Sequence, residues 1–115
     1  PFTISGNGKQ VRDVLHSEDM KRLYRSVLEC RRHSKGEVFN IGGGWGNSLS
    51  LLELFAILGE HLSIRMKFAH LPARKSDQRV FIADISKAED ALGWAPQVGS
   101  VAGVSQMLDW VSAIK

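Results

Sequence analysis

Two short segments of the chain each place an arginine near an aspartate. They are Gln10-Val11-Arg12-Asp13 and Ala73-Arg74-Lys75-Ser76-Asp77-Gln78, about sixty residues apart. A guanidinium is planar, always charged and able to bind two phosphate oxygens at once, and a neighbouring carboxylate can hold it in one orientation. Because Gly8 and Pro72 place both arginines in loops beside predicted strands, we predict that Arg12 and Arg74 bind one diphosphate together. The alternative for either arginine is a solvated or ion-paired surface residue.

No other set of side chains in the sequence indicates chemistry on a substrate. The histidines His16, His33, His61 and His70 are scattered without the spacing of metal ligands, so we predict no metal site. No serine occupies a G-x-S-x-G turn, and Cys30 falls just beyond the apolar stripe of a predicted helix, where we expect it to pack as a small residue. We therefore predict that this chain carries no catalytic residue.

A glycine-rich segment, Ile41-Gly42-Gly43-Gly44-Trp45-Gly46, lies between a predicted strand and a predicted helix, as a dinucleotide-binding turn does. The spacing of such a turn is absent, because counting from Gly42 the third glycine would fall at Asn47. No acidic residue ends the next predicted strand, and the Gly-Lys-Ser/Thr of a P-loop does not occur. We predict that these glycines turn the backbone sharply and that no cofactor binds to this chain.

Length and charge favour one domain without a nucleic-acid partner. With 115 residues, 43% of them hydrophobic, the chain can build one core, so we predict a single unit over residues 1–115. The net charge of +3 comes from mixed charges, and the only basic cluster is Arg31, Arg32, His33 and Lys35. This cluster falls at the end of a predicted helix, where cations complement the helix dipole. Nucleic-acid binding through it is the weaker alternative.

The sequence also bears on compartment and membrane. The single cysteine excludes an internal disulfide and fits a reducing environment, so we expect a cytoplasmic location. The richest apolar run, residues 49–58, has about half the length that a bilayer requires, so we predict no membrane span. The first residues have no signal-peptide pattern and no initiator methionine, and we expect the chain to begin within a longer protein.

Alternating strands and helices predict the α/β class. Strands are expected at residues 2–4, 11–15, 37–41, 64–69 and 79–83, with a turn at residues 6–8. The helix over residues 50–62 is apolar nearly all round, so we expect it to be buried between layers. We also expect it to join the strands at 37–41 and 64–69 in a right-handed parallel crossover.

Capping signals mark the starts of the predicted helices. The first is expected to start at a Ser17 cap and to run to Gly36, with Tyr24 in its buried apolar stripe. Capping-box spacing marks two later starts, at Ser50 with Glu53 and at Ser86 with Glu89. We expect Gly93 and Pro96 to end the third predicted helix and Ser100 to cap the fourth.

Taken in order, five stretches of the chain resemble the C-terminal third of the extended short-chain dehydrogenase/reductases. They are residues 4–19, 39–43, 48–54, 72–81 and 83–96. Within that superfamily the wording most resembles the CDP-tyvelose 2-epimerases, also called CDP-paratose 2-epimerases. The segments of this closer resemblance are Asn47-Ser48-Leu49-Ser50-Leu51-Leu52-Glu53 and Ser76-Asp77-Gln78-Arg79-Val80-Phe81.

The resemblance implies a nucleotide-diphosphate sugar as the ligand. In such enzymes a Rossmann half binds NAD, a YxxxK pair moves protons, and the sugar is transiently oxidised so that a stereocentre can be inverted. The C-terminal part holds the nucleotide. By this resemblance Arg12 and Arg74 match positions that contact the diphosphate, and Asp77 matches one near the ribose or its arginine.

The chain departs from the family pattern at the reaction centre. Its only tyrosine is Tyr24, and the fourth residue after it is Leu28, so the YxxxK pair is absent. Our leading hypothesis is the nucleotide-sugar-binding portion of an NAD-dependent epimerase that lacks most of the Rossmann half and is inactive alone. The alternative is a non-catalytic remnant or interaction module that self-associates through the second face of the apolar helix 50–62.

Overall fold

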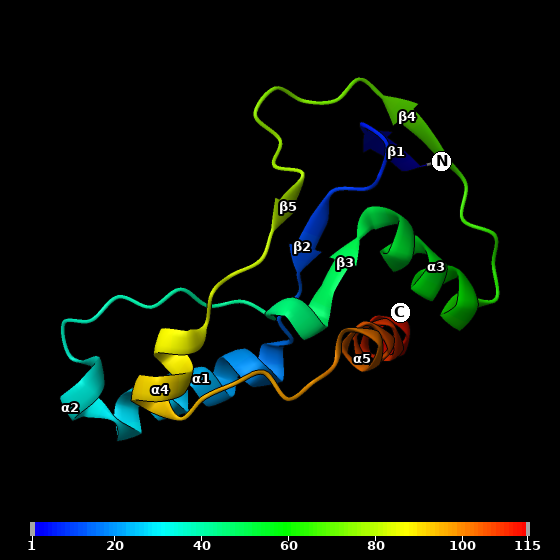
Figure 1. Cartoon of the computed structure of the whole chain (residues 1–115). Coiled ribbons are helices and arrows are strands. Elements are labelled where there is room, and N and C mark those ends of the chain that lie inside the picture. Colours follow the sequence, from blue (N-terminus) through cyan, green and yellow to red (C-terminus); the bar gives the residue numbers. More distant parts are fainter. Residues whose placement is uncertain (1, 115) are drawn as a thin grey trace. The chain divides into compact units, whose positions relative to one another are not determined.

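The computed structural model of the chain describes residues 2–114 and confirms the predicted α/β class (Figure 1). The strands are β1 (Phe2–Ser5), β2 (Val11–Asp13), β3 (Ser48–Ser50), β4 (Phe68–Leu71) and β5 (Val80–Phe81). The helices are α1 (Ser17–Glu29), α2 (Arg31–Ser34), α3 (Leu51–Leu62), α4 (Ser86–Leu92) and α5 (Ser100–Ala113), and a 3₁₀ turn, η1 (Trp45–Asn47), precedes β3. None of the described helices combines the length and apolarity that a membrane crossing requires.

The chain divides into two compact units. Unit 1 contains the chain up to Arg12, Leu49–Phe81 and the chain from Val101 onward, and unit 2 contains Asp13–Ser48 and Ile82–Ser100. Neither unit is one continuous stretch of sequence. The prediction of a single domain over residues 1–115 stays a prediction.

Parallel strand pairs position the loops of unit 1. β1 pairs in parallel with β4, with Ser5 opposite Leu71, and the two strands lie side by side in Figure 1. β2 pairs in parallel with β5, with Val11 opposite Val80, in a sheet of order β3-β2-β5. Because parallel strands end at the same edge, residues 6–10 and residues 72–79 leave the β1–β4 pair together. We call residues 72–79, which connect β4 to β5, the arginine loop.

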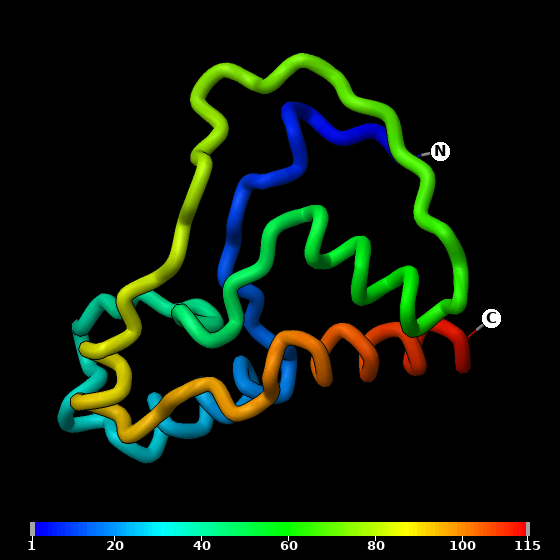
Figure 2. Tube along the Cα trace, turned by 45° about the vertical axis from the view of Figure 1, so that its right-hand side comes forward, coloured from blue at the N-terminus to red at the C-terminus, as the bar shows by residue number. Residues whose placement is uncertain are grey.

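Helix α3 packs on the β1–β4 pair through an aromatic side chain. The Phe55 ring lies 6.1 Å from the Phe2 ring and 5.3 Å from the Phe68 ring, centroid to centroid. α3 also runs beside α5 in both Figure 1 and Figure 2, and His61 Nε2 lies 3.0 Å from Asp109 Oδ1. No residue of α3 is buried within residues 2–114, so the expectation of a helix buried between layers is wrong for this chain.

The predicted capping box at the start of α3 is confirmed. The Glu53 N–H donates to Ser50 Oγ at 3.2 Å, and Glu53 Oε2 accepts from the Ser50 N–H at 2.7 Å. These two bonds satisfy backbone donors that a helix start otherwise leaves unpaired. Hydrogen bonds from the Ser50 N–H and hydroxyl hold the pKa of the Glu53 carboxyl below its ordinary value.

The core of unit 2 is formed by side chains from α1, α4 and the segment after α4. The buried residues Leu23, Ala88, Leu92 and Trp94 form one cluster. In Figure 2 the trace of α4 is yellow and that of α1 runs from blue to cyan. Trp94, only 2% exposed, donates from Nε1 to the Asp19 carbonyl oxygen at 2.9 Å. This bond satisfies the one polar group of the buried indole.

The Asp19 carboxylate is fully buried and is the polar centre of this core. It accepts the backbone N–H groups of Gln97, at 3.1 Å, and Val98, at 3.0 Å, and it pairs with the Arg22 guanidinium. Burial by itself raises the pKa of Asp19, but the two N–H donors and the Arg22 charge together hold that pKa below its ordinary value. Asp19 thus fastens the segment after α4 to α1.

Helix α1 differs from the prediction at both of its ends and in the residues of its buried apolar face. Its N-cap is His16, whose Nδ1 accepts the Glu18 N–H at 3.2 Å, and not Ser17. It ends at Glu29 because Cys30 leaves helical geometry, with φ −97° and ψ 39°, and the basic residues continue in the short α2. The tyrosine expected in the core, Tyr24, is 64% exposed.

Two other local predictions in unit 2 are wrong. Residues 37–41 form no strand, and Lys87 Nζ binds the Val38 carbonyl at 2.9 Å and Glu37 Oε2 at 2.7 Å. The parallel partner of β4 is accordingly β1, and the predicted crossover between residues 37–41 and 64–69 does not form. At α4 the Ser86 hydroxyl and N–H bind Asp84 Oδ1, so Ser86 and Glu89 make no capping box.

Candidate anion-binding pocket

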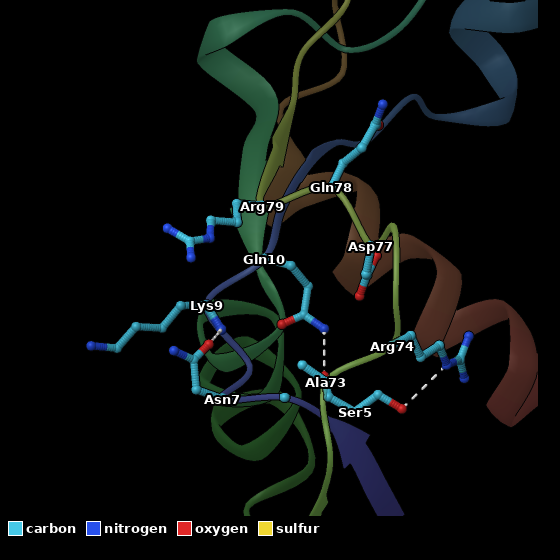
Figure 3. A pocket seen from close by; sticks show the side chains of 10 residues that line it. Ser5, Asn7, Lys9, Gln10, Ala73, Arg74, Asp77, Gln78 and Arg79 are labelled. Carbon is cyan, nitrogen blue, oxygen red and sulfur yellow. Dashed lines mark hydrogen bonds between the residues drawn. The ribbon is translucent and has the colours of Figure 1, made fainter.

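An open pocket of about 720 Å³ lies in unit 1, between residues 5–10 and the arginine loop. This volume falls in the range of about 300–1,000 Å³ that is usual for small-molecule sites. Figure 3 shows the lining side chains. They come from Ser5, Gly6, Asn7, Lys9, Gln10, Ala73, Arg74, Asp77, Gln78 and Arg79.

Turn chemistry shapes the wall formed by residues 5–10. Gly6 has φ +83° and Gly8 has φ +75°, backbone conformations that side chains with a Cβ rarely adopt. Asn7 Oδ1 accepts the Lys9 N–H at 3.0 Å, a local bond that favours the turn. Gly8 is further restricted, because a Cβ there would lie 2.9 Å from Leu52 Cδ2. The turn predicted at residues 6–8 is confirmed.

Arg74 lines the pocket and is held at one nitrogen. Its Nε donates to Ser5 Oγ at 3.2 Å, and Gln10 Nε2 donates to the Ser5 carbonyl oxygen at 3.0 Å (Figure 3). Both bonds connect the arginine loop and the β2 side of the pocket to the end of β1. The guanidinium of the second predicted arginine is therefore in the pocket wall.

Arg12 contacts the arginine loop and is not among the residues that line the pocket. Its Nη1 donates to the Val11 carbonyl at 2.8 Å and to the Gln78 carbonyl at 2.9 Å, and its Nη2 lies 3.2 Å from Asp77 Oδ1. Arg12 and Asp77 are thus together, and Asp77 and Arg74 lie on the same loop. That all three bind a ligand stays a prediction.

Asp13, expected to orient the adjacent Arg12, binds elsewhere. Its Oδ2 accepts the backbone N–H groups of Gly44 and Ala83, each at 3.1 Å. These three residues belong to unit 2, whereas the partners of Arg12 belong to unit 1. The carboxylate that holds Arg12 is Asp77, from the second motif, and the pairing of neighbours within the first motif is wrong.

Two cationic residues of the pocket were missed by the sequence reasoning. Lys9 and Arg79 both line it, and in Figure 3 they extend to one side while Arg74 extends to the other. Since the Asp77 carboxylate is paired with Arg12, the lining keeps an excess of positive charge. Their positions offered a signal, because Lys9 follows the glycine turn and Arg79 directly follows the second motif.

The glycine loop of unit 2 does not fit the phosphates of a dinucleotide. A Cβ on Gly42 would lie 2.0 Å from Asp13 Oδ2, and one on Gly43 would lie 1.8 Å from the Val14 carbonyl oxygen. The chain itself therefore fills the space beside Gly42 and Gly43, and at Gly42 the nearest atom is a carboxylate oxygen, which would repel a phosphate. Only Gly44 of the three has a left-handed φ, +72°. That NAD does not bind to this chain stays a prediction.

No group of three or more metal-ligating side chains occurs within residues 2–114. The His70 ring, for example, lies with Nδ1 2.8 Å from the Gly6 carbonyl oxygen and against the Phe68 ring. His61 is paired with Asp109. Both histidines thus have structural partners.

The profile of one protein family, described as GDP-mannose 4,6 dehydratase, matches residues 1–107. The chain belongs to this family. Among its relatives, a CDP-paratose 2-epimerase of Salmonella typhi is 57% identical over 114 residues, which are 99% of this chain and 34% of that protein. A UDP-glucuronate 4-epimerase of Thermodesulfobacterium geofontis is 31% identical over 110 residues, or 96% of this chain and 33% of that protein.

Solved structures agree with this membership of the GDP-mannose 4,6 dehydratase family. The UDP-glucuronic acid 4-epimerase of Bacillus cereus, in complex with UDP-glucuronic acid and NAD, matches with a TM-score of 0.89 and 30% identity over 100% of this chain and 36% of that one. The chain thus spans about a third of the length of the relatives that it matches. The predicted resemblance to the extended short-chain dehydrogenase/reductases and to CDP-paratose 2-epimerases is confirmed.

Proposed function

We propose that this chain is the nucleotide-sugar-binding portion of an NAD-dependent nucleotide-sugar epimerase similar to CDP-paratose (CDP-tyvelose) 2-epimerase. In this proposal the pocket of unit 1 receives the diphosphate of the nucleotide sugar. Arg74 contacts the phosphates, and Arg12 and Asp77 complete the substrate-binding set.

The observation that carries the proposal is the charge of the pocket lining. Lys9, Arg74 and Arg79 line the pocket, and the one lining carboxylate, Asp77, is already paired with Arg12. A diphosphate is the complement of such a surface, because hydrogen bonds from cations to phosphate oxygens are short and strong. The 57% identity to a CDP-paratose 2-epimerase supports a cytidine diphosphate as the nucleotide.

We further propose that the chain binds this ligand but does not catalyse its conversion. Tyr24 is the only tyrosine, no lysine lies four residues after it, and it is exposed on α1, which belongs to the unit that does not hold the pocket. The glycine loop has no room for a dinucleotide phosphate beside Gly42 and Gly43. NAD would then be bound by residues outside this chain. A cytoplasmic location likewise stays a prediction.

Isothermal titration of the 115-residue chain with CDP and with UDP tests the proposal. We expect micromolar to millimolar binding of CDP, weakened at least tenfold by Arg74→Ala, since a charge-assisted hydrogen bond contributes about 1.5–3 kcal/mol. Arg65→Ala is the matched control, because Arg65 is exposed in the same unit and does not line the pocket. A folded chain that binds neither nucleotide would contradict the proposal.

The second candidate function is self-association. Met107 and Trp110 on α5, and Ile114 directly after it, follow one another at intervals of three and four residues and are 49%, 63% and 62% exposed. Such a stripe is typical of a face that packs against another protein surface. Sedimentation velocity over a range of concentrations tests this candidate, and a single monomeric species at every concentration would exclude it. Trp110→Ser should reduce any association that is seen.

A further inference from the structure

Arg74 can bind an anion in one geometry only if its flexible side chain is held in place. The residue lies in the exposed arginine loop, and a free arginine side chain has many rotamers. Arg74 Nε donates a hydrogen bond to Ser5 Oγ at 3.2 Å, and this bond restricts the orientation of the guanidinium plane. The side chain is thereby oriented before any ligand arrives.

Ser5 is itself held by the pairing of its strand and by one side chain. It is the last residue of β1 and lies opposite Leu71 in the parallel pair. The following N–H, of Gly6, donates to the Leu71 carbonyl at 2.9 Å, and Gln10 Nε2 donates to the Ser5 carbonyl at 3.0 Å. The hydroxyl that meets Arg74 therefore projects from a strand end whose backbone is held from both sides of the pocket.

The choice of nitrogen decides how an anion can approach Arg74. A guanidinium has five N–H donors, one on Nε and two on each Nη, and it can present either the Nε–Nη edge or the Nη–Nη edge to a phosphate. Since Ser5 occupies the Nε–H, the edge formed by the two Nη groups remains for the ligand. A phosphate would then be bound end-on.

We infer that Ser5 is a positioning residue, which orients Arg74 so that its two Nη groups bind the diphosphate end-on. The inference rests on the proposed function, because it assumes that the pocket holds a diphosphate. Ser5 does not need to touch the ligand. Its effect on binding passes through Arg74 alone.

The test is an NMR titration of the chain with CDP, which follows binding into the millimolar range. Ser5→Ala should weaken CDP binding about fivefold, the usual effect of one hydrogen bond. Ser5→Thr keeps the hydroxyl on a strand and should bind within about twofold of the unchanged chain. Thr3→Ala, an exposed position on the same strand, is the control and should bind like the unchanged chain.

Two further readings separate positioning from a general effect on the fold. The Arg74 Nε–H resonance should be visible in the unchanged chain and in Ser5→Thr, and it should broaden or disappear in Ser5→Ala. In an Arg74→Ala background, Ser5→Ala should have no further effect on CDP binding. Equal weakening in both backgrounds, or an unchanged affinity in Ser5→Ala, would overturn the inference while leaving the proposed function standing. Absence of CDP and UDP binding to the unchanged chain would overturn both.

Discussion

Replacing Asp19 by asparagine should strongly destabilise unit 2. The carboxylate is fully buried and uses both oxygens, one for the Val98 N–H and the other for the Gln97 N–H and the Arg22 guanidinium. Asparagine has the same shape but only one acceptor oxygen. Its amide NH₂ would face one of the two backbone N–H groups, which would lose its partner.

The expected loss follows from these contacts. A buried N–H left unpaired costs about 1–3 kcal/mol, and replacing a carboxylate by a neutral oxygen weakens each remaining bond, adding about 1 kcal/mol. We expect the free energy of unfolding to fall by about 3 kcal/mol, which corresponds to roughly a hundredfold change in the unfolding equilibrium. The Trp94 bond is unaffected directly, because it goes to the Asp19 backbone carbonyl.

Urea unfolding monitored by tryptophan fluorescence measures this change. Trp94 is 2% exposed, whereas Trp45 and Trp110 are 81% and 63% exposed, so the spectral shift reports mainly on the core around Asp19. Glu18→Gln is the control, since it removes a neighbouring exposed carboxylate whose partner is Lys21. Arg22→Gln should lie between the two and remains measurable if Asp19→Asn does not fold. Equal unfolding midpoints for Asp19→Asn and Glu18→Gln would refute the reasoning.

The same substitution predicts a pH dependence. Because the folded-state pKa of Asp19 lies below its unfolded value of about 3.9, its contribution is complete above that pH and is lost as the pH falls through the lower, folded-state value. The difference in unfolding free energy between the unchanged chain and Asp19→Asn should therefore be constant near neutral pH. It should shrink below about pH 4. A difference that grows on acidification would contradict the assigned direction.

Substitutions at three other sites, two of them with a comparison variant, test the local structure, and each is measured by thermal or urea unfolding. Asp13→Ala should destabilise the chain by about 2 kcal/mol because two backbone N–H groups lose their acceptor, while Asp13→Asn can keep one oxygen at that position and should cost less than about 1 kcal/mol. Gly42→Ala should cost at least about 1–3 kcal/mol through the clash with Asp13, whereas Gly46→Ala, with no atom within 4 Å of the new Cβ, should be nearly neutral. Ser50→Ala should lower the free energy of unfolding by about 1 kcal/mol, because α3 loses its N-cap. An unchanged free energy of unfolding would show that the capping box does not stabilise the chain.

Local rules predicted the elements that depend on nearby residues. The turn at residues 6–8, the capping box at Ser50 and the left-handed Gly93 after α4 are set by contacts within a few residues, and all three are present. The predicted strand at residues 37–41 is absent, and Lys87, about fifty positions later in the chain, binds the Glu37 carboxylate and the Val38 carbonyl there. Periodicity carries no information on such a distant side chain.

The site was predictable in its residue types and not in its pairings. Arg74 and Asp77 were found from the second motif, and both line the pocket. The partner of Arg12 could not be read from the sequence, because the adjacent Asp13 is nearer in the chain while Asp77 is nearer in space. Parallel pairing of β2 with β5 creates that proximity, and strand partners are chosen by the whole fold.

The interleaved order of the two units has a practical consequence for protein engineering. The sequence passes from one unit to the other at four junctions, after residues 12, 48, 81 and 100. A chimera that transplants the pocket-bearing unit into another scaffold would therefore need three separate inserts joined in the right order, and any single splice point would divide that unit. Domain shuffling by one crossover is accordingly unsuited to this protein, and recombination libraries should place their breakpoints at those four positions together.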